Sequence, residues 1–190
     1  MEPDSGAARP GTRHGASFGI GNKLFRVLWG ASWLVLGRFT PPPLHSWRVL
    51  VLRAFGAKVG RGVRIYGSTR VWDPRRLAIG ADTLVGPRVN LYNQGRVTVG
   101  RNVVISQDAT ICASTHDVDD PTFPLLLRPV TIGDEAWIAA LAFVGPGVRV
   151  GEGTVLGACA VAMRALEPWT YYTGNPAVAL KPRGRMASAA

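Results

Sequence analysis

The segment ASTHDVDDPTF, residues 113–123, gathers one histidine, three aspartates and two threonines within eleven residues. A neutral imidazole can accept a proton from an alcohol at neutral pH, which makes His116 the side chain best suited to acid–base chemistry here. Asp117 is its nearest carboxylate in sequence. That aspartate could orient the imidazole, bind an acceptor, or form a turn in a solvated loop.

The elements that must position this histidine follow a six-residue rhythm. Aliphatic residues mark the rhythm at Val59, Ile65, Val71, Ile79, Val85, Leu91, Val99, Ile105, Ile111, Ile132, Ile138, Val144, Val150 and Leu156. Neither a helix of 3.6 residues per turn nor a two-residue strand alternation produces this spacing. It predicts a prism-shaped solenoid, with three short flat sides per coil and coils stacked as parallel sheets around the aliphatic residues. Coils that begin at residues 59, 79 and 99 are twenty residues apart.

Two features of the rhythm predict the corners of the prism. Glycine directly follows many aliphatic positions, at Gly60, Gly80, Gly86, Gly100, Gly133, Gly145, Gly151 and Gly157. A corner needs either unusual backbone angles or a close approach between coils, and glycine permits both. The one long interval, from Ile111 to Ile132, predicts a loop over residues 113–130 that is extruded from a corner and carries His116.

The repeat domain is predicted over residues 57–170, between a flexible tail at 1–17, a helical segment at 18–56 and a C-terminal segment at 171–190. Only eleven residues separate Arg26 from Arg38, fewer than the roughly 20 apolar residues of a membrane-crossing helix. The prolines at 41–43 would end a first amphipathic helix before a second over 44–55. These helices could pack on the main domain or form a peripheral membrane contact through residues 18–56.

Charge and cysteine usage narrow the function classes. The net charge of +10 and isoelectric point near 10.8 suit a nucleic acid, a membrane surface or an anionic cofactor. No face interleaves aromatic and basic residues, so we expect no nucleic acid partner. Cys112 and Cys159 lie in apolar stretches and are predicted to be buried free thiols. This usage favours the cytoplasm, at the inner face of the membrane if the helical segment binds lipid.

The repeats, the STHD loop, the WI pair at residues 137–138 and the GNPA run at residues 174–177 occur in an order that resembles the hexapeptide-repeat acyltransferases. Within that family the chain is most similar to the colanic acid biosynthesis acetyltransferases, from Asn22 to about Lys181. The resemblance implies a mainly β protein, a left-handed parallel β-helix with an N-terminal helical cap and one extruded loop. It further implies a homotrimer with acetyl-CoA in the groove between neighbouring prisms and no metal requirement.

By this resemblance the chain is an O-acetyltransferase that acts on a carbohydrate hydroxyl in exopolysaccharide or glycan biosynthesis. His116 would be the general base, which agrees with the poor nucleophilicity of a sugar hydroxyl at neutral pH. The backbone amide of Ala140 corresponds to the group that faces the thioester oxygen, where the tetrahedral oxyanion needs a donor. Ala158 corresponds to a backbone contact with the pantetheine arm.

The remaining site residues also come from the resemblance. Asn90 and Asn93 are equal candidates for binding the acceptor, in addition to Asp117. Arg164, Lys181 and Arg183 are placed to meet the phosphates of CoA. Trp137 could pack against the cofactor or only shape its coil.

Departures from the family pattern leave alternatives open. Leu141 stands where relatives commonly have an acid, and the run AVAMRALEP, with Met163, replaces the usual SVVTKDLP. Alternative functions are acetylation of a small hydroxyl or amino compound, such as an antibiotic or amino acid, and a non-catalytic β-helix scaffold. A zinc enzyme of the carbonic anhydrase type would need three converging histidines, and His116 is alone in the repeat domain.

Overall fold

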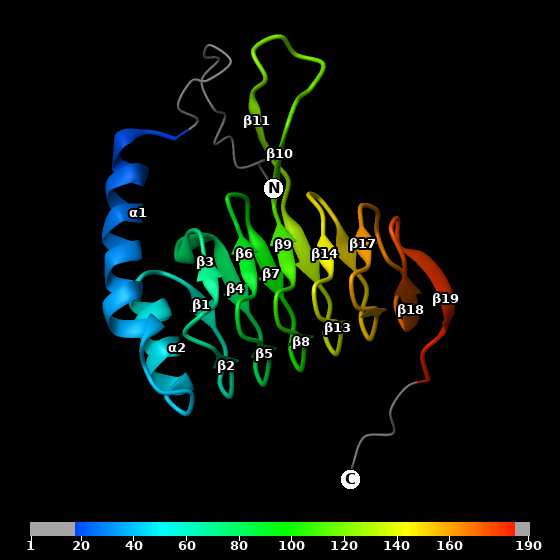
Figure 1. Cartoon of the computed structure of the whole chain (residues 1–190), viewed down its shortest axis with the longest axis horizontal. Coiled ribbons are helices and arrows are strands. Elements are labelled where there is room, and N and C mark those ends of the chain that lie inside the picture. Colours follow the sequence, from blue (N-terminus) through cyan, green and yellow to red (C-terminus); the bar gives the residue numbers. More distant parts are fainter. Residues whose placement is uncertain (1–17, 185–190) are drawn as a thin grey trace.

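The computed structural model describes residues 18–184; the predicted tail at 1–17 and residues 185–190 lie outside this range. Helix α1 (Ile20–Trp33) continues into the π-helical segment η1 (Leu34–Arg38), and helix α2 (His45–Ala54) follows. These three elements form a cap beside the first coil of a prism of parallel strands (Figure 1). The predicted mainly β solenoid with an N-terminal helical cap is confirmed, and it is the left-handed parallel β-helix expected.

Three sheets form the sides of the prism, and each coil contributes one strand to each sheet. The first sheet contains β1 (Lys58–Val59), β4 (Leu77–Ile79), β7 (Val97–Val99), β12 (Val130–Ile132) and β15 (Arg149–Val150). The second contains β2 (Arg64–Ile65), β5 (Leu84–Val85), β8 (Val104–Ile105), β13 (Trp137–Ile138), β16 (Val155–Leu156), β18 (Thr170–Thr173) and the antiparallel β19 (Val178–Pro182). The third contains β3 (Arg70–Val71), β6 (Asn90–Tyr92), β9 (Thr110–Cys112), β14 (Phe143–Val144) and β17 (Val161–Ala162). A short 3₁₀ helix, η2 (Pro74–Arg76), forms one corner.

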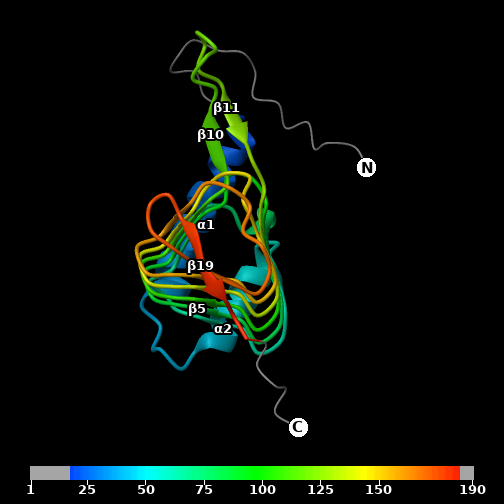
Figure 2. The same ribbon diagram turned by 90° about the vertical axis from the view of Figure 1, so that its right-hand side faces the viewer.

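The aliphatic rhythm becomes the core of the prism. Val59 pairs with Ile79 and Ile79 with Val99, so the twenty-residue coil keeps its register. Val99 then pairs with Ile132 across the long interval, so the insertion leaves the stack undisturbed. The rhythmic residues are buried along the prism axis, where the coils superpose in an end-on view (Figure 2). β18 extends the second sheet slightly past residue 170, where the repeat domain was predicted to end.

Close approach between coils is the reason for the corner glycines. A Cβ atom on Gly80 would lie 2.5 Å from the carbonyl carbon of Gly100 and 2.6 Å from its oxygen. Gly60, Gly100, Gly133 and Gly151 face the next coil in the same way. None of these has a positive φ angle, whereas non-glycine corner residues such as Asp82 and Leu141 do. Of the two predicted reasons, unusual backbone angles therefore do not apply at these positions.

The cap is attached by polar groups that meet backbone carbonyls. Trp29 and Trp33 are buried and donate their indole N–H groups to the carbonyls of Val71, at 2.8 Å, and Thr69, at 3.1 Å. Proline nitrogens carry no hydrogen, yet the carbonyls of the 41–43 run still need donors. The buried guanidinium of Arg48 supplies them, donating to the carbonyls of Pro41 and Pro42. Among residues 18–184, no helix is long and apolar enough to cross a bilayer.

The prediction that both cysteines are buried is wrong for one of them. Cys112 is half-buried in β9, whereas Cys159 is exposed and both thiols are free. Cys159 occupies a prism corner with a φ angle of 59°, where the chain turns outward. An apolar neighbourhood in sequence does not predict burial there because corner side chains point away from the core.

Two glycine-to-alanine variants test the close-approach argument. Gly80→Ala should lower the free energy of unfolding by about 1–3 kcal/mol, because the methyl group must displace the backbone of the next coil. Gly30→Ala, in the interior of α1 with open space around its Cα, should raise it by about 0.5–1 kcal/mol. Chemical denaturation of the two variants measures both free energies of unfolding. Equal changes in the two variants would contradict the argument that close approach between coils requires glycine at residue 80.

Candidate active site

His116 lies on a hairpin that projects from the prism (Figures 1 and 2). Strand β10 (Ser114–His116) pairs antiparallel with β11 (Leu125–Leu127), which places His116 opposite Leu125. The base of the hairpin is tied to the prism by the buried Ser114 hydroxyl, which donates to the Gln94 side chain at 2.7 Å. The predicted extruded loop is therefore an ordered arm that holds its histidine away from the core.

The imidazole of His116 has one nitrogen occupied and one available. Its Nδ1 lies 2.9 Å from the carbonyl oxygen of Phe123. A carbonyl can only accept a hydrogen bond, so we assign the proton of the neutral ring to Nδ1 and the unprotonated acceptor to Nε2. The ring also stacks on Phe123, with centroids 4.4 Å apart and planes 10° from parallel. His116 is exposed, and no residue within 18–184 makes a hydrogen bond to its Nε2.

Phe123 and the turn before it are functional candidates that sequence reasoning missed. Phe123 has a φ angle of 50°, a conformation that is costly for a bulky residue, and donates its amide to the Asp120 carbonyl at 2.9 Å. The Asp120 carboxylate accepts the Thr122 hydroxyl and amide, both at 2.7 Å, and these bonds hold the pKa of Asp120 below its usual value. An Asp-Pro-Thr turn signal directly before an aromatic residue could have indicated this support for the histidine.

Asp117 takes part in a turn rather than in a contact with the imidazole. Its carboxylate accepts the amide of Asp119 at 3.1 Å, and its own amide donates to Pro124 at 3.0 Å. The group that orients His116 is the Phe123 carbonyl, not the neighbouring carboxylate. Of the roles left open for Asp117, only turn formation has a contact in the free chain.

Ala140 and Ala158 occupy equivalent corners between the second and third sheets on successive coils. The Cys159 amide donates to the Ala140 carbonyl at 3.0 Å, which stacks the two corners. Within residues 18–184, the amides of Ala140 and Ala158 donate to no protein acceptor. Two unpaired donors in one column form a backbone edge that can bind a carbonyl oxygen or an amide-containing chain.

The surroundings of this corner are apolar. Trp137 is 44% exposed and donates its indole N–H to the Ser106 hydroxyl at 3.0 Å, so the contact holds its ring against the second sheet. Leu141 has a φ angle of 61° and projects an exposed side chain next to Ala140. Of the two departures from the family pattern, Leu141 therefore places an apolar side chain beside the corner column. Met163 is also exposed, but it follows β17 and lies at the opposite end of the third-sheet strands, beside Gly145.

The three cations predicted to bind phosphate differ in their contacts within the protein. Arg164 and Lys181 are exposed and make no side-chain hydrogen bond or ion pair within the described chain. Arg183 donates through Nη1 to the carbonyls of Glu135 and Gly153, both at 2.9 Å. These carbonyls lie at the corner between the first and second sheets, so part of the Arg183 guanidinium already stabilises a different corner from that of Ala140.

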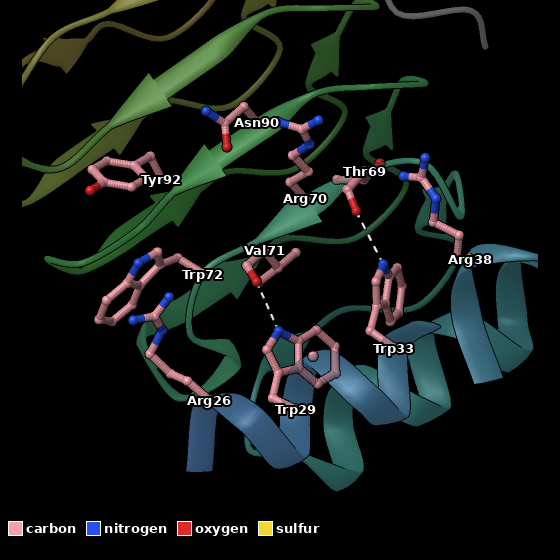
Figure 3. Close-up of a pocket in the computed structure, with 11 residues that line it drawn as sticks. Arg26, Trp29, Trp33, Arg38, Thr69, Arg70, Val71, Trp72, Asn90 and Tyr92 are labelled. Carbon is pink, nitrogen blue, oxygen red and sulfur yellow. Dashed lines mark hydrogen bonds between the residues drawn. The ribbon is translucent and has the colours of Figure 1, made fainter. Parts of the chain in front are cut away.

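Asn90 lines a pocket of about 450 Å³ between α1 and the outer face of the third sheet (Figure 3). It begins β6 and pairs with Arg70 on one side and Thr110 on the other. Its side chain faces outward and makes no hydrogen bond to the residues at 18–184. The amide is therefore available to a hydroxyl-bearing ligand.

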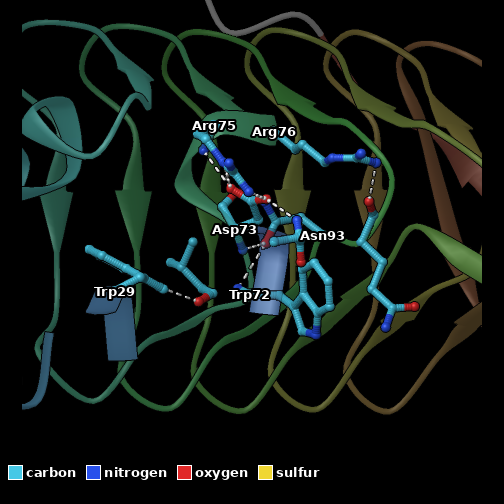
Figure 4. Close-up of polar contacts among 9 residues, drawn as sticks. Trp29, Trp72, Asp73, Arg75, Arg76 and Asn93 are labelled. Carbon is cyan, nitrogen blue, oxygen red and sulfur yellow. Dashed lines mark hydrogen bonds and ion pairs between the residues drawn. The ribbon is translucent and has the colours of Figure 1, made fainter. Parts of the chain in front are cut away.

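Asn93 is fully buried, and its side chain is occupied (Figure 4). Its Oδ1 accepts the amides of Trp72 and Asp73, at 2.9 and 3.2 Å, and its Nδ2 donates to the Asp73 carbonyl at 2.6 Å. It ties one coil to the next at a prism corner. Of the two asparagine candidates, only Asn90 reaches a surface that an acceptor can occupy.

Within one chain, the His116 imidazole lies far along the strands from the corner amides of Ala140 and Ala158. Ala140 precedes β14 and His116 follows β9, and these parallel neighbours lie in the third sheet. The corner amides and the hairpin are thus at opposite ends of the strands of that sheet. No group of three His, Cys, Asp or Glu side chains among residues 18–184 could hold a metal ion.

Comparisons with known proteins agree with this architecture. Residues 129–161 match the family described as bacterial transferase hexapeptide (six repeats). The chain is 38% identical over 163 residues to WcaF of Escherichia coli K12, a relative named for its proposed role as a colanic acid biosynthesis acetyltransferase. The alignment covers 86% of this chain and 90% of that relative.

Solved structures share the fold at low sequence identity. A maltose O-acetyltransferase from Clostridium difficile 630 superposes with a TM-score of 0.80 and 20% identity, covering 88% of this chain and 90% of that one. A hexapeptide-repeat acetyltransferase from Vibrio cholerae, complexed with acetyl coenzyme A, gives a TM-score of 0.80 and 19% identity, covering 90% and 94%.

Proposed function

The chain belongs to the hexapeptide-repeat acetyltransferases, and from that premise we propose that it transfers the acetyl group of acetyl-CoA to a hydroxyl of a sugar in exopolysaccharide or glycan biosynthesis. The observation that carries the proposal is the arrangement of His116. Its Nδ1 is bound by the Phe123 carbonyl, which leaves Nε2 as a proton acceptor on an ordered, projecting arm. The relative named for colanic acid biosynthesis and the structural neighbour named a maltose O-acetyltransferase support a carbohydrate acceptor.

The reaction follows from the groups present. His116 Nε2 removes the proton of the sugar hydroxyl as that oxygen attacks the thioester carbonyl. The Ala140 amide donates to the oxyanion that develops on the carbonyl oxygen. The imidazolium of His116 then returns its proton to the departing CoA sulfur, which yields an acetyl ester and free CoA. No covalent enzyme intermediate is required, because the acceptor hydroxyl attacks the thioester directly.

The column of corner amides fits the co-substrate. The unpaired amide of Ala158 lies one coil beyond that of Ala140 and can bind the pantetheine arm through backbone alone, so the side-chain departures nearby do not remove it. Arg164 and Lys181, both exposed and unpaired in the described chain, are available to the phosphates of CoA. The remaining guanidinium nitrogens of Arg183 can contribute as well.

We further propose that the active enzyme is a homotrimer whose sites lie between neighbouring prisms. In one chain the hairpin and the corner amides are at opposite ends of the third-sheet strands. A rotation of a second copy beside the first can bring its hairpin to the first copy's corner column. Closed symmetry then completes every site in the same way.

We also propose a peripheral membrane contact through the outward face of α1 and η1. This outer face of the cap is formed by Ile20, Leu24, Val27, Leu28, Leu34, Val35 and Phe39. Val27, Val35 and Phe39 are 71%, 72% and 79% exposed. It lies on the side of the helix opposite Trp29 and Trp33, which are buried against the prism. A surface helix normally presents polar groups outward, so this face needs an apolar partner.

The positive charge of residues 18–56 favours an anionic lipid surface as that apolar partner. Residues 18–56 contain no Asp or Glu and five Lys or Arg residues, of which Arg48 is buried and Lys23 is exposed on α1. An apolar helix face flanked by cations is typical of helices that lie in the interface of anionic bilayers. Acetyl-CoA is a cytoplasmic metabolite, so we assign the contact to the inner face of the membrane.

His116→Ala should lower kcat by at least about a hundredfold and leave the KM for acetyl-CoA nearly unchanged, because the base acts on the acceptor hydroxyl. Steady-state transfer assays with a carbohydrate acceptor measure both constants. Asp119→Asn is the matched control in the same hairpin, since the Asp119 carboxylate makes no hydrogen bond to residues 18–184. A His116→Ala enzyme with full activity would exclude the general-base role.

Co-expression of two inactive chains tests the intersubunit site. Ala158→Phe should block the pantetheine path at an exposed corner, and His116→Ala should remove the base. Trimers assembled at random from equal amounts of the two chains should regain about a quarter of wild-type activity, since that share of all sites combines an intact hairpin with an intact corner. A chain that carries both changes should stay inactive, and mixtures without any regain would place the whole site within one chain.

Val27→Asp combined with Val35→Asp should abolish binding to vesicles of phosphatidylcholine and phosphatidylglycerol, because two carboxylates would have to enter the lipid interface. Cosedimentation measures this binding, which should also weaken with added salt and be absent with phosphatidylcholine alone. Val178→Asp, on β19 with 59% exposure, is the control and should bind normally. If the double variant instead changes only the oligomeric state, the face is an interface between copies.

A further inference from the structure

The pocket that Asn90 lines has an unusual charge balance. Three arginines, Arg26, Arg38 and Arg70, contribute to its wall, and none of its lining residues is acidic (Figure 3). Its volume of about 450 Å³ is within the range of small-ligand sites, roughly 300–1,000 Å³. The pocket therefore combines room for a sugar-sized ligand with a concentration of positive charge.

These three guanidinium groups have no anionic partner in the described chain. None of them makes a side-chain hydrogen bond or an ion pair with residues 18–184. Two exposed arginines elsewhere in the described chain do have carboxylate partners: Arg88 binds Asp108 at 2.6 Å and Arg101 binds Asp134 at 2.9 Å. Unpaired cations that share one concave surface raise its positive potential and attract an anion.

The acidic residue that follows Trp72 in sequence is already paired with a cation. Asp73 is fully buried and binds the Arg75 guanidinium through both carboxylate oxygens, at 2.9 and 2.7 Å (Figure 4). It also accepts the Arg75 amide at 3.0 Å. Asp73 therefore does not neutralise the pocket, and the arginines in the pocket wall remain available to a ligand.

The aromatic and amide groups of the same pocket suit a sugar ring. The Arg26 guanidinium lies 3.9 Å from the centroid of the Trp72 ring, which fixes its plane and leaves its N–H edge free. Tyr92, 36% exposed, adds a second ring that can pack on the apolar face of a sugar. Asn90 supplies a donor and an acceptor for hydroxyl groups.

We infer that the acceptor is an anionic sugar, whose phosphate or carboxylate group is bound by Arg26, Arg38 and Arg70 while its ring lies between Asn90 and the aromatic side chains. This inference rests on the proposed acetyl transfer and specifies its substrate class. Guanidinium groups bind both kinds of oxyanion in bidentate geometry, so the shared chemistry is a sugar-linked oxyanion. A neutral glycoside would leave the three cations unpaired.

Binding of small probes to the full-length protein tests the inference without acetyl transfer. Isothermal titration calorimetry should give a Kd for inorganic pyrophosphate or for glucuronate at least about tenfold lower than for methyl glucoside. Arg38→Gln and Arg70→Gln, both at exposed positions, should each weaken anion binding about tenfold or more and leave CoA binding unchanged. Stronger binding of pyrophosphate would indicate a phosphate-linked sugar, and stronger binding of glucuronate a uronic acid.

Arg149→Gln is the control, because Arg149 is exposed on the first sheet, away from the pocket, and has no side-chain partner among residues 18–184. It should bind anions like the wild type. The inference is wrong if methyl glucoside binds as tightly as both anions, if Arg149→Gln weakens binding equally, or if the pocket variants weaken CoA binding instead. His116→Ala should retain anion binding, so a failure of the acetyl-transfer proposal remains distinguishable.

Discussion

Backbone hydrogen bonding between coils in a fixed register is the constraint on which the rest of this structure depends. Strands of only two or three residues are stable here because each pairs with the coil before it and the coil after it. Glycines at the corners let these backbones approach, as at Gly80 against Gly100. Because a change of register would turn aliphatic residues outward, the chain can vary only where it leaves the prism, at its corners and ends.

The groups proposed to carry out acyl transfer lie at the corners of the prism. The hairpin that carries His116 leaves a corner between the third and first sheets, and the unpaired amides of Ala140 and Ala158 form the corner between the second and third. The prism separates them within one chain, and this separation is the basis of the proposed site between neighbouring copies. The positive φ angle of Phe123 lies in a turn that the Asp120 carbonyl and carboxylate support, and the base of the hairpin is anchored to the stack through Ser114.

The helical cap adds two further surfaces to the prism. One side of α1 packs its tryptophans on the first coil, and the same packing forms the pocket beside Asn90. The other side leaves an apolar face on the outside of the molecule. A cationic pocket for an anionic sugar next to a lipid-binding face would suit an acceptor presented at a membrane surface.

Sequence alone determined the prism, its twenty-residue register, the excursion that carries His116 and the two capping helices, because spacing between aliphatic residues depends directly on the geometry of the coil. It left Asn90 and Asn93 equal, predicted burial for Cys159 and gave no role to Phe123 or Arg70. Those questions depend on whether a side chain points inward or outward and on which neighbours converge in space. Only the tertiary structure decided them, because coils distant in sequence supply the carbonyls, rings and charges that each side chain meets.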